Sequence, residues 1–202
     1  MHRKGLVIAH FHKDGKLRSD TLSILQCLVP LFDHVIFVST HLLDSERDKI
    51  PACVTLHVRP NTGYDFYSYR FGIKYLQAQG GHWQITVMNT SFMVQHPQRL
   101  VANFFERCLS SPDFDVLGLT HSNEVQPHLQ SYLLTFSSHC TRHPAFIEWW
   151  DQMTPRDERF AVVFHCELGL SSNPFELNLD SLTCAMAQDV GFAELVGEGL
   201  GN

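Results

Sequence analysis

Short apolar runs alternate with amphipathic segments along this sequence, and that alternation restricts the chain to few architectures. The runs GLVIAHF at residues 5–11 and HVIFVS at residues 34–39 are apolar almost throughout. Such runs are typical of strands that are buried on both faces, which occurs when helices cover a parallel sheet. We therefore expect an α/β fold in which strands and helices alternate around a mostly parallel central sheet.

The same patterns place the remaining elements. Apolar runs predict strands, and apolar residues that return every three or four positions predict helices. The predicted strands are residues 5–11, 34–39, 53–58, 84–88, 115–119, 132–136 and 161–164. The predicted helices are residues 19–32, with Ser19 as N-cap and Pro30 in the last turn, and residues 65–76, 97–109, 143–153 and 180–189.

Length and charge narrow the class of protein. A chain of 202 residues with 44% hydrophobic residues is long enough for one domain with a substantial core. A formal net charge of -6 and the lack of a Lys/Arg run argue against a nucleic-acid partner. The six cysteines are scattered, and no stretch approaches the roughly 18 apolar residues of a membrane span. We expect a cytoplasmic protein with reduced thiols.

The stretch RPNTGYDFYSYR, from Arg59 to Arg70, carries more polar groups than a turn requires. Asn61 and Gly63 suffice for the turn, because glycine adopts positive φ without steric cost. Asp65 and the two arginines lie where a strand ends and a helix begins, a position at which open α/β sheets bind anions. Two readings remain open: a ligand site with Arg59 and Arg70 on phosphates, or a helix cap formed by Asp65.

The stretch MNTS follows the predicted strand at residues 84–88. A pair of carboxylates at this point would hold a divalent cation, Mn²⁺ or Mg²⁺, against a diphosphate. The chain carries Asn89, Thr90 and Ser91 instead, so the residues identify no certain cofactor, and we expect no tightly held metal. Asn89 and Ser91 remain able to bond sugar hydroxyls.

Three other groups of residues have both a functional and a structural interpretation. His10 and His12 alternate on one strand and, with His165, would suit a metal-dependent hydrolase, although chance pairs are expected among 13 histidines. Cys140 and His143 would suit thiol catalysis but lack a nucleophile signature. The aromatic run FIEWW is a sugar platform or, more commonly, core. Glu167 is a general base or an ion-pair residue.

Taken in order, several stretches resemble the rhamnan synthesis protein F family, which is glycosyltransferase-like and acts in bacterial polysaccharide assembly. The resemblance rests on VIAHFHKDG, RPNTGYDFYSYRFGI, MNTSF, DFDVLGLT followed by HLQSYLLTFS, FIEWW and CELGLS. It implies a single Rossmann-like, GT-A-like nucleotide-sugar transferase domain over residues 1–202. Residues 1–110 would then form the donor-binding half, and residues 111–202 the acceptor-binding half.

The resemblance also implies roles for individual residues. Glu167 would be the catalytic base. The donor would be bound by His10, Asn61, Gly63, Asp65, Asn89 and Ser91, and the acceptor by His128, Gln130, Ser131 and Ser171. Independently of the resemblance, we assign Arg59 and Arg70 to the donor as well, because they cluster with the start of the helix. Thr90 stands where the family carries the middle carboxylate of an Asn-Asp-Ser element, so the resemblance does not extend to that group.

The implied partners are a nucleoside-diphosphate sugar donor, such as one of rhamnose, and an oligosaccharide or lipid-linked glycan acceptor. A lipid-linked acceptor would place the protein at the inner face of the plasma membrane, as in lipopolysaccharide assembly, although no strongly basic amphipathic helix is evident. Two alternatives stay open. One is a non-catalytic sugar- or nucleotide-binding member of an assembly complex, and the other is the metal-dependent hydrolase.

Overall fold

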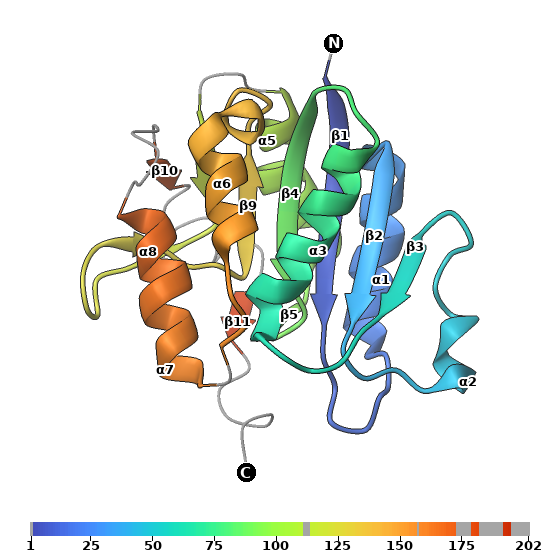
Figure 1. Ribbon diagram of the computed structural model, residues 1–202. Helices are drawn as coiled ribbons and strands as arrows, with labels where there is room; N and C mark the ends of the chain where they lie inside the picture. Colours follow the sequence, from blue (N-terminus) through green and yellow to red (C-terminus); the bar gives the residue numbers. More distant parts are fainter. Residues whose placement is uncertain (1, 111–113, 157, 173–178, 182–191, 195–202) are drawn as a thin grey trace.

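A computed structural model of the protein describes residues 2–110, 114–156, 158–172, 179–181 and 192–194. Seven strands form the central sheet: β1 (Arg3–His10), β2 (His34–Ser39), β3 (Thr55–Val58), β4 (Trp83–Asn89), β6 (Val116–Gly118), β9 (Leu133–Phe136) and β10 (Leu179–Ser181). Their order across the sheet is β10-β6-β9-β4-β1-β2-β3 (Figure 1). Within it, β9 alone is antiparallel to its neighbours, β4 and β6. The predicted mostly parallel α/β sheet is confirmed.

Helices and short strands connect these seven strands. The helices are α1 (Ser19–Leu28), α2 (Asp44–Arg47), α3 (Tyr64–Ala78), α4 (Pro97–Leu100), α5 (Glu106–Ser110), α6 (Pro144–Gln152), α7 (Arg159–Val162) and α8 (Leu168–Ser171). Residues Val101–Phe105 and Val163–Glu167 are π-helical, and Val29–Leu31 and Cys140–Arg142 form 3-10 turns. Two small antiparallel pairs complete the described part of the chain: β5 (Phe92–Val94) with β11 (Phe192–Glu194), and β7 (His121–Ser122) with β8 (His128–Leu129).

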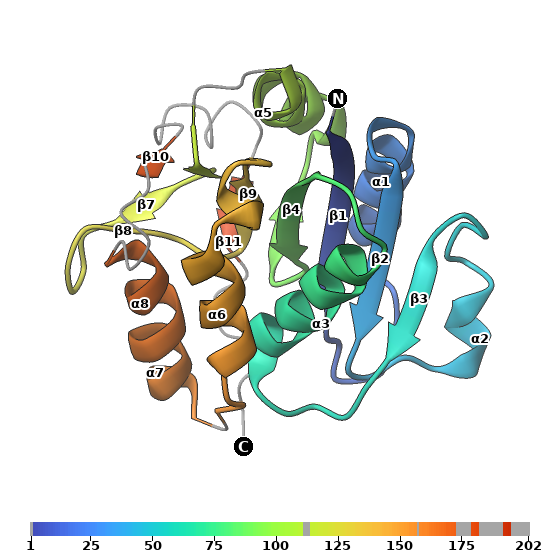
Figure 2. The same ribbon diagram turned by 45° about the horizontal axis from the view of Figure 1, so that its top comes forward.

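Helices cover both faces of the sheet, so the core has two layers (Figures 1 and 2). Because side chains alternate along a strand, Leu6 and Ile8 of β1 face α1 and the α4–α5 segment, whereas Val7 and Ala9 face α3 and α6. All four side chains are essentially inaccessible to solvent. This two-sided burial explains why the strands read as continuous apolar runs.

Gly72 allows α3 to lie against β1. A Cβ added at Gly72 would come within 2.3 Å of Val7 Cγ1, closer than any real contact. We expect Gly72→Ala to lower the free energy of unfolding by about 2 kcal/mol through overpacking, measured by urea denaturation. Gly169 in α8 is the matched control, because nothing lies within 4 Å of its added Cβ. There, Ala should raise stability by up to about 1 kcal/mol; equal losses at both positions would contradict close packing at Gly72.

One predicted element was wrong, a second is contradicted at its first residues, and one cap differs. Residues 161–164 are helical, because Val162, Cys166 and Leu170 are buried at a spacing of four, a helical period that the run AVVF conceals. The helix predicted at 180–189 is replaced at its start by β10, and residues 182–189 lie outside the described residues. Helix α1 is capped by Arg18 in extended conformation, without a side-chain bond, rather than by Ser19. None of the helices described is long and apolar enough to cross a bilayer.

Candidate functional site

The strand order reverses between β1 and β4. From β1 the chain adds β2 and then β3 on one side, and β4 pairs with the other side of β1. In open α/β sheets ligands bind at the carboxyl ends of the strands at such a reversal, because the following loops diverge there. Those ends are His10 for β1 and Asn89 for β4. This edge of the sheet is hereafter called the switch-point edge.

Two motifs that are separate in the sequence meet at the switch-point edge. Asn89 Nδ2 donates a hydrogen bond of 2.7 Å to Asp65 Oδ2, which joins the end of β4 to the first turn of α3. Asn89 Oδ1 in turn accepts bonds from Ser91 N at 3.1 Å and from Ser91 Oγ at 2.6 Å. The structure therefore brings together Asp65, Asn89 and Ser91. Asp65 bonds this neighbouring strand rather than simply capping its own helix.

The carboxyl group of Asp65 is in an environment that resists ionisation. Burial raises its pKa from 3.8 to about 6, and the negative charge of Glu167 adds to the rise, while the bond from Asn89 and the charge of Arg59 oppose it. Part of the residue nevertheless remains accessible to solvent. A carboxyl that is costly to ionise and partly open to ligands is characteristic of functional sites.

Glu167 approaches the same edge from a helix instead of following a strand as predicted. Its Oε1 accepts a 2.6 Å hydrogen bond from the backbone N–H of Ser131, and the Ser131 carbonyl accepts a bond from Tyr69 Oη at 3.1 Å. Burial, together with the charges of Asp65 and Glu167, holds the pKa of Tyr69 well above its usual value. The buried phenol of Tyr69 thus stays neutral and links α3 to the segment that holds Glu167.

The RPNTGYD loop is held by Arg59. This buried guanidinium donates to the carbonyls of Pro60, Thr62 and Tyr64 at 2.6 to 2.9 Å and, from Nε and Nη2, to Ser68 Oγ. These bonds use all five of its N–H groups. A phosphate ligand would have to displace some of them. Gly63 and Tyr64 have φ of 71° and 51°, so the turn needs the glycine and stores strain at the tyrosine. Asn61 is exposed in this loop.

Arg70 points toward α6. It donates from Nε to the carbonyl of Trp150 at 2.6 Å and from Nη2 to that of Asp151 at 3.2 Å. These carbonyls belong to the last turn of α6, where they have no partner within the helix. The structure therefore gives Arg70 a capping role that the sequence did not indicate.

His10 anchors the loop that follows β1. Its Nδ1 lies 2.8 Å from Ser39 Oγ, and its Nε2 lies 3.2 Å from the Lys16 carbonyl, which can only accept. Burial lowers the pKa of His10 to about 4, so the ring is neutral at pH 7 and Nε2 carries the proton. His10 is the last residue of β1, as predicted. Its side chain bonds the backbone carbonyl of Lys16.

The loop between β1 and α1 brings positive charge that the sequence analysis did not assign. Lys13 and Lys16 are exposed on either side of Gly15, whose φ is 63° and whose carbonyl is bonded by Leu43 N–H at 2.8 Å. Arg18 donates to the carbonyls of Thr90 at 2.7 Å and Phe92 at 2.8 Å. Arg18 thus connects this loop to the loop after β4. The sequence HKDGK, in which a glycine turn lies between two lysines, is the feature that could have indicated this positively charged loop.

The predicted acceptor-side residues lie in the segment between β7 and β9 and at the end of α8. His128 is buried in β8 with Nδ1 2.8 Å from the Gln126 carbonyl. Gln130 accepts from Thr120 Oγ1 at 2.7 Å, and its backbone N–H bonds the Thr120 carbonyl. Ser131 carries the bond to Glu167 described above. Ser171 is the last residue of α8.

The other candidate groups have structural roles. Cys140 is fully buried, and burial raises the pKa of its thiol far above the usual value, while His143 Nδ1 caps α6 through Ala145 N–H. Phe146 and Trp150 are core residues. Among the described residues, no group of three or more His, Cys, Asp or Glu side chains is arranged to hold a metal ion. Asp65 Oδ2 and Asn89 Oδ1 accept bonds within the chain, so a cation bound to these two oxygens would have to displace those bonds.

Solved structures share the fold at low sequence identity. Mannose-1-phosphate geranyltransferase from Thermus thermophilus aligns over 90% of this chain and 74% of its own, with a TM-score of 0.56 and 9% identity. A protein described as a nucleotide-diphospho-sugar transferase from Desulfovibrio desulfuricans G20 aligns over 91% of this chain and 80% of its own, with a TM-score of 0.53 and 12% identity. HddC from Yersinia pseudotuberculosis aligns over 90% of both chains, with a TM-score of 0.51 and 11% identity. The predicted nucleotide-sugar transferase fold is confirmed.

Sequence comparison identifies the family. The uncharacterized protein y4gN of Sinorhizobium fredii (strain NBRC 101917 / NGR234) is 27% identical over 173 residues, which are 83% of this chain and 44% of y4gN. The chain thus spans less than half the length of this relative. The sequence profile of rhamnan synthesis protein F matches residues 35–174, which include the Asp65–Asn89 pair and Glu167. The chain belongs to the rhamnan synthesis protein F family.

Proposed function

We propose that the chain binds a nucleoside-diphosphate sugar at the switch-point edge and transfers the sugar to a growing cell-surface polysaccharide. The observation that carries this proposal is the convergence of Asp65, Asn89 and Glu167 where the strand order reverses. Rhamnose is the candidate sugar because the family description names a rhamnan. A lipid-linked acceptor would bring the protein to the cytoplasmic face of a membrane.

The donor sugar or ribose would bond to Asp65, Asn89 and Ser91. These side chains already form one hydrogen-bonded chain, so a ligand hydroxyl would meet positioned partners. Asn61 and Gly63 would shape the adjoining loop, with Arg59 holding its carbonyls in place. Residues 1–110 would thus form the donor half, as predicted.

The leaving diphosphate needs positive charge as its bond to the sugar breaks. Lys13 and Lys16, which are exposed in the loop after β1, would supply it, and neutral His10 fixes the backbone of Lys16. Arg18 is paired with Asp20 and donates to backbone carbonyls, so it holds this loop in place instead. Arg59 and Arg70 are committed to carbonyl groups, so we assign them positioning roles. The step as proposed relies on these residues and is not routed through a metal ion.

Glu167 would act as the general base on the acceptor side. Its carboxylate takes the proton of the acceptor hydroxyl, whose oxygen forms a bond to the anomeric carbon. The bond from that carbon to the diphosphate breaks, and its electron pair leaves with the nucleoside diphosphate. The N–H of Ser131 orients Glu167 through one oxygen, which leaves the other for the acceptor. His128, Gln130 and Ser171 would line the acceptor path in residues 111–202.

A non-catalytic binding protein is the second candidate. Thr90 stands at the turn after β4, where a carboxylate would be needed to hold a cation, and the neighbouring Asn89 and Ser91 bond each other. This closed arrangement suits a protein that binds a nucleotide sugar without breaking it. Binding without release of nucleoside diphosphate, with any acceptor, would favour this candidate.

A thermal-shift screen of nucleotide sugars, with and without manganese, tests the donor site, because a ligand of the native state raises the melting temperature. We expect at least one nucleoside-diphosphate sugar to raise it, and the double variant Lys13→Ala/Lys16→Ala to lose most of that rise. Lys4→Ala/Arg142→Ala removes the same charge away from the switch-point edge and should retain it. No shift with any donor, or an unchanged shift in the first variant, would contradict the proposal.

A further inference from the structure

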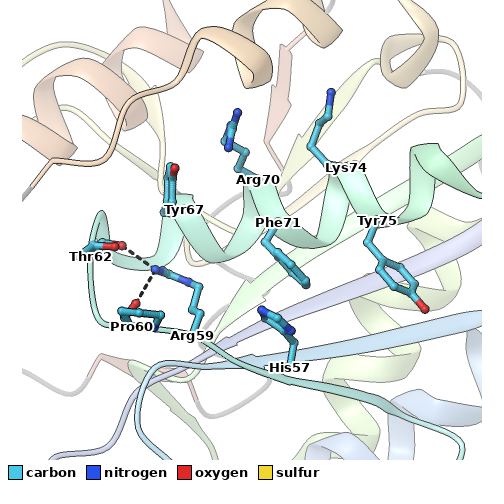
Figure 3. Close-up of a pocket in the computed structure, with 9 residues that line it drawn as sticks. All are labelled: His57, Arg59, Pro60, Thr62, Tyr67, Arg70, Phe71, Lys74 and Tyr75. Carbon is cyan, nitrogen blue, oxygen red and sulfur yellow. Dashed lines mark hydrogen bonds between the residues drawn. The ribbon is translucent and has the colours of Figure 1, made fainter.

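A concave surface lies along α3, on the side that faces β3 at the edge of the sheet (Figure 3). It has a volume of about 510 Å³. Its lining residues are His57, Arg59, Pro60, Thr62, Tyr67, Arg70, Phe71, Lys74 and Tyr75. We call it the α3 groove. It contains neither Asp65 nor Asn89, so its chemistry is distinct from that of the donor site.

The α3 groove carries an aromatic row beside a cationic row. Tyr67, Phe71 and Tyr75 recur every four residues and lie about 6 Å apart along the helix axis. Arg70 and Lys74 follow the same spacing on the adjoining side, and Figure 3 shows both pointing away from His57. Figure 3 also shows Tyr67 on the side of these cations, whereas Phe71 and Tyr75 point to the side of His57. A ligand of several units that crosses the groove would therefore meet both aromatic and cationic side chains.

The aromatic row is held in place before any ligand binds. Phe71 stacks on His57 with ring centroids 3.8 Å apart and 12° between the planes. The guanidinium carbons of Arg59 and Arg70 each lie 5.4 Å from the Tyr67 ring. One face of Phe71 is covered by His57, whereas Tyr75 is 39% exposed and offers an apolar surface on which a sugar ring can pack, at little cost in conformational entropy.

Lys74 can exchange its present partner for an anionic ligand, and Arg70 can add one nitrogen without leaving its partners on α6. Lys74 pairs with Asp151, and the two side chains are 42% and 44% exposed. Exposed ion pairs contribute little to stability, so transferring Lys74 to another anion costs little. Arg70 caps α6 through Nε and Nη2, and its Nη1 bonds no group in the described part of the chain. No acidic residue lines the groove itself.

We propose that the α3 groove binds a short stretch of anionic glycan, with sugar rings on the aromatic row and carboxylate or phosphate groups on Arg70 and Lys74. This inference rests on the proposed function, because it assigns the groove to the part of the acceptor chain that extends beyond the acceptor path of residues 111–202. Because rhamnose is neutral, the anionic groups would belong to other units of that chain. Bound there, a growing polymer would remain near the switch-point edge between transfers. The groove would therefore favour longer acceptors over single sugars.

Titration calorimetry with trigalacturonic acid, a mannopentaose phosphate and neutral maltotriose tests this proposal. We expect at least one acidic probe to bind about tenfold more tightly than maltotriose; the two acidic probes distinguish carboxylate from phosphate. Tyr75→Ala should weaken that binding about fivefold and Lys74→Ala about threefold. Phe160→Ala, which removes an aromatic ring that is 76% exposed on α7, should leave it unchanged.

The proposal is overturned if the acidic probes bind no better than maltotriose, if none binds, or if Phe160→Ala weakens binding as much as Tyr75→Ala. The donor site is read separately, by the thermal shift that nucleotide sugars produce in the same variants. A groove variant that loses glycan binding but keeps the thermal shift produced by nucleotide sugars has a defect in the α3 groove alone. Absent donor shifts in the unmodified protein contradict the donor site and leave the glycan titration as an independent result.

Discussion

Replacing Glu167 with Gln is expected to lower the rate of sugar transfer about 10²- to 10³-fold, while donor affinity changes by less than about twofold. Gln has the same shape and can still accept the bond from Ser131 N–H, so the helix that carries it should keep its position. What Gln lacks is the ability to take a proton from the acceptor hydroxyl. The measurement is release of nucleoside diphosphate in the presence of acceptor, beside donor binding by thermal shift.

Glu148→Gln provides the matched control. Glu148 lies exposed on α6, where it accepts a bond from Gln152, and it does not touch the switch-point edge. Its replacement should leave both rate and affinity unchanged. If Glu167→Gln transfers sugar at the wild-type rate with the fold intact, Glu167 is not the base. If transfer and donor affinity fall together, the residue instead helps to hold the donor.

The parts of the site that sequence reasoning found are those set by strand ends. His10 and Asn89 end buried strands, and Asp65 begins a helix, so the parallel topology places them at one edge. Their local patterns are strong because the apolar runs define the strand limits to within a residue or two. The family resemblance grouped these residues at the donor, and the parallel fold class is enough to explain why they lie at one edge.

The parts that sequence reasoning could not find depend on long-range contacts. Arg59 and Arg70 look alike in sequence, yet one binds its own loop and the other binds a helix about 80 residues later in the chain. Arg18 reaches carbonyls more than 70 residues away. No spacing rule encodes such partners. The helical setting of Glu167 was hidden for a different reason, since Ala161 to Phe164 is rich in β-branched and aromatic residues that favour strands.

Replacing Asp65 with Asn is expected to weaken donor binding about 10- to 100-fold, because the variant loses a charged acceptor for ligand hydroxyls. The same change should not destabilise the protein near neutral pH. Asn is isosteric, and its carbonyl oxygen can accept the bond from Asn89. Loss of binding with no loss of stability would mark Asp65 as a residue retained for function.

The raised pKa of Asp65 determines whether the Asp65→Asn variant is more or less stable than the wild type at a given pH. The pKa of Asp65 is about 6 in the folded protein and 3.8 in its ordinary state, so between these values the folded state binds more protons than the unfolded state. The contribution of Asp65 to stability therefore falls as pH rises from about 4 to about 6, by on the order of 2 kcal/mol. The amide of the Asp65→Asn variant cannot titrate, so the variant avoids this loss.

Urea denaturation of both proteins at pH 4 and pH 7 measures the difference. We expect similar free energies of unfolding at pH 4 and a variant that is more stable than the wild type at pH 7, by up to about 2 kcal/mol. The opposite result would be a variant whose free energy of unfolding, compared with that of the wild type, is lower at pH 7 than at pH 4. It would mean that ionised Asp65 stabilises the fold through Arg59 and Asn89. The carboxylate would then be explained by structure alone, and the case for a donor ligand at this position would rest on the binding measurement.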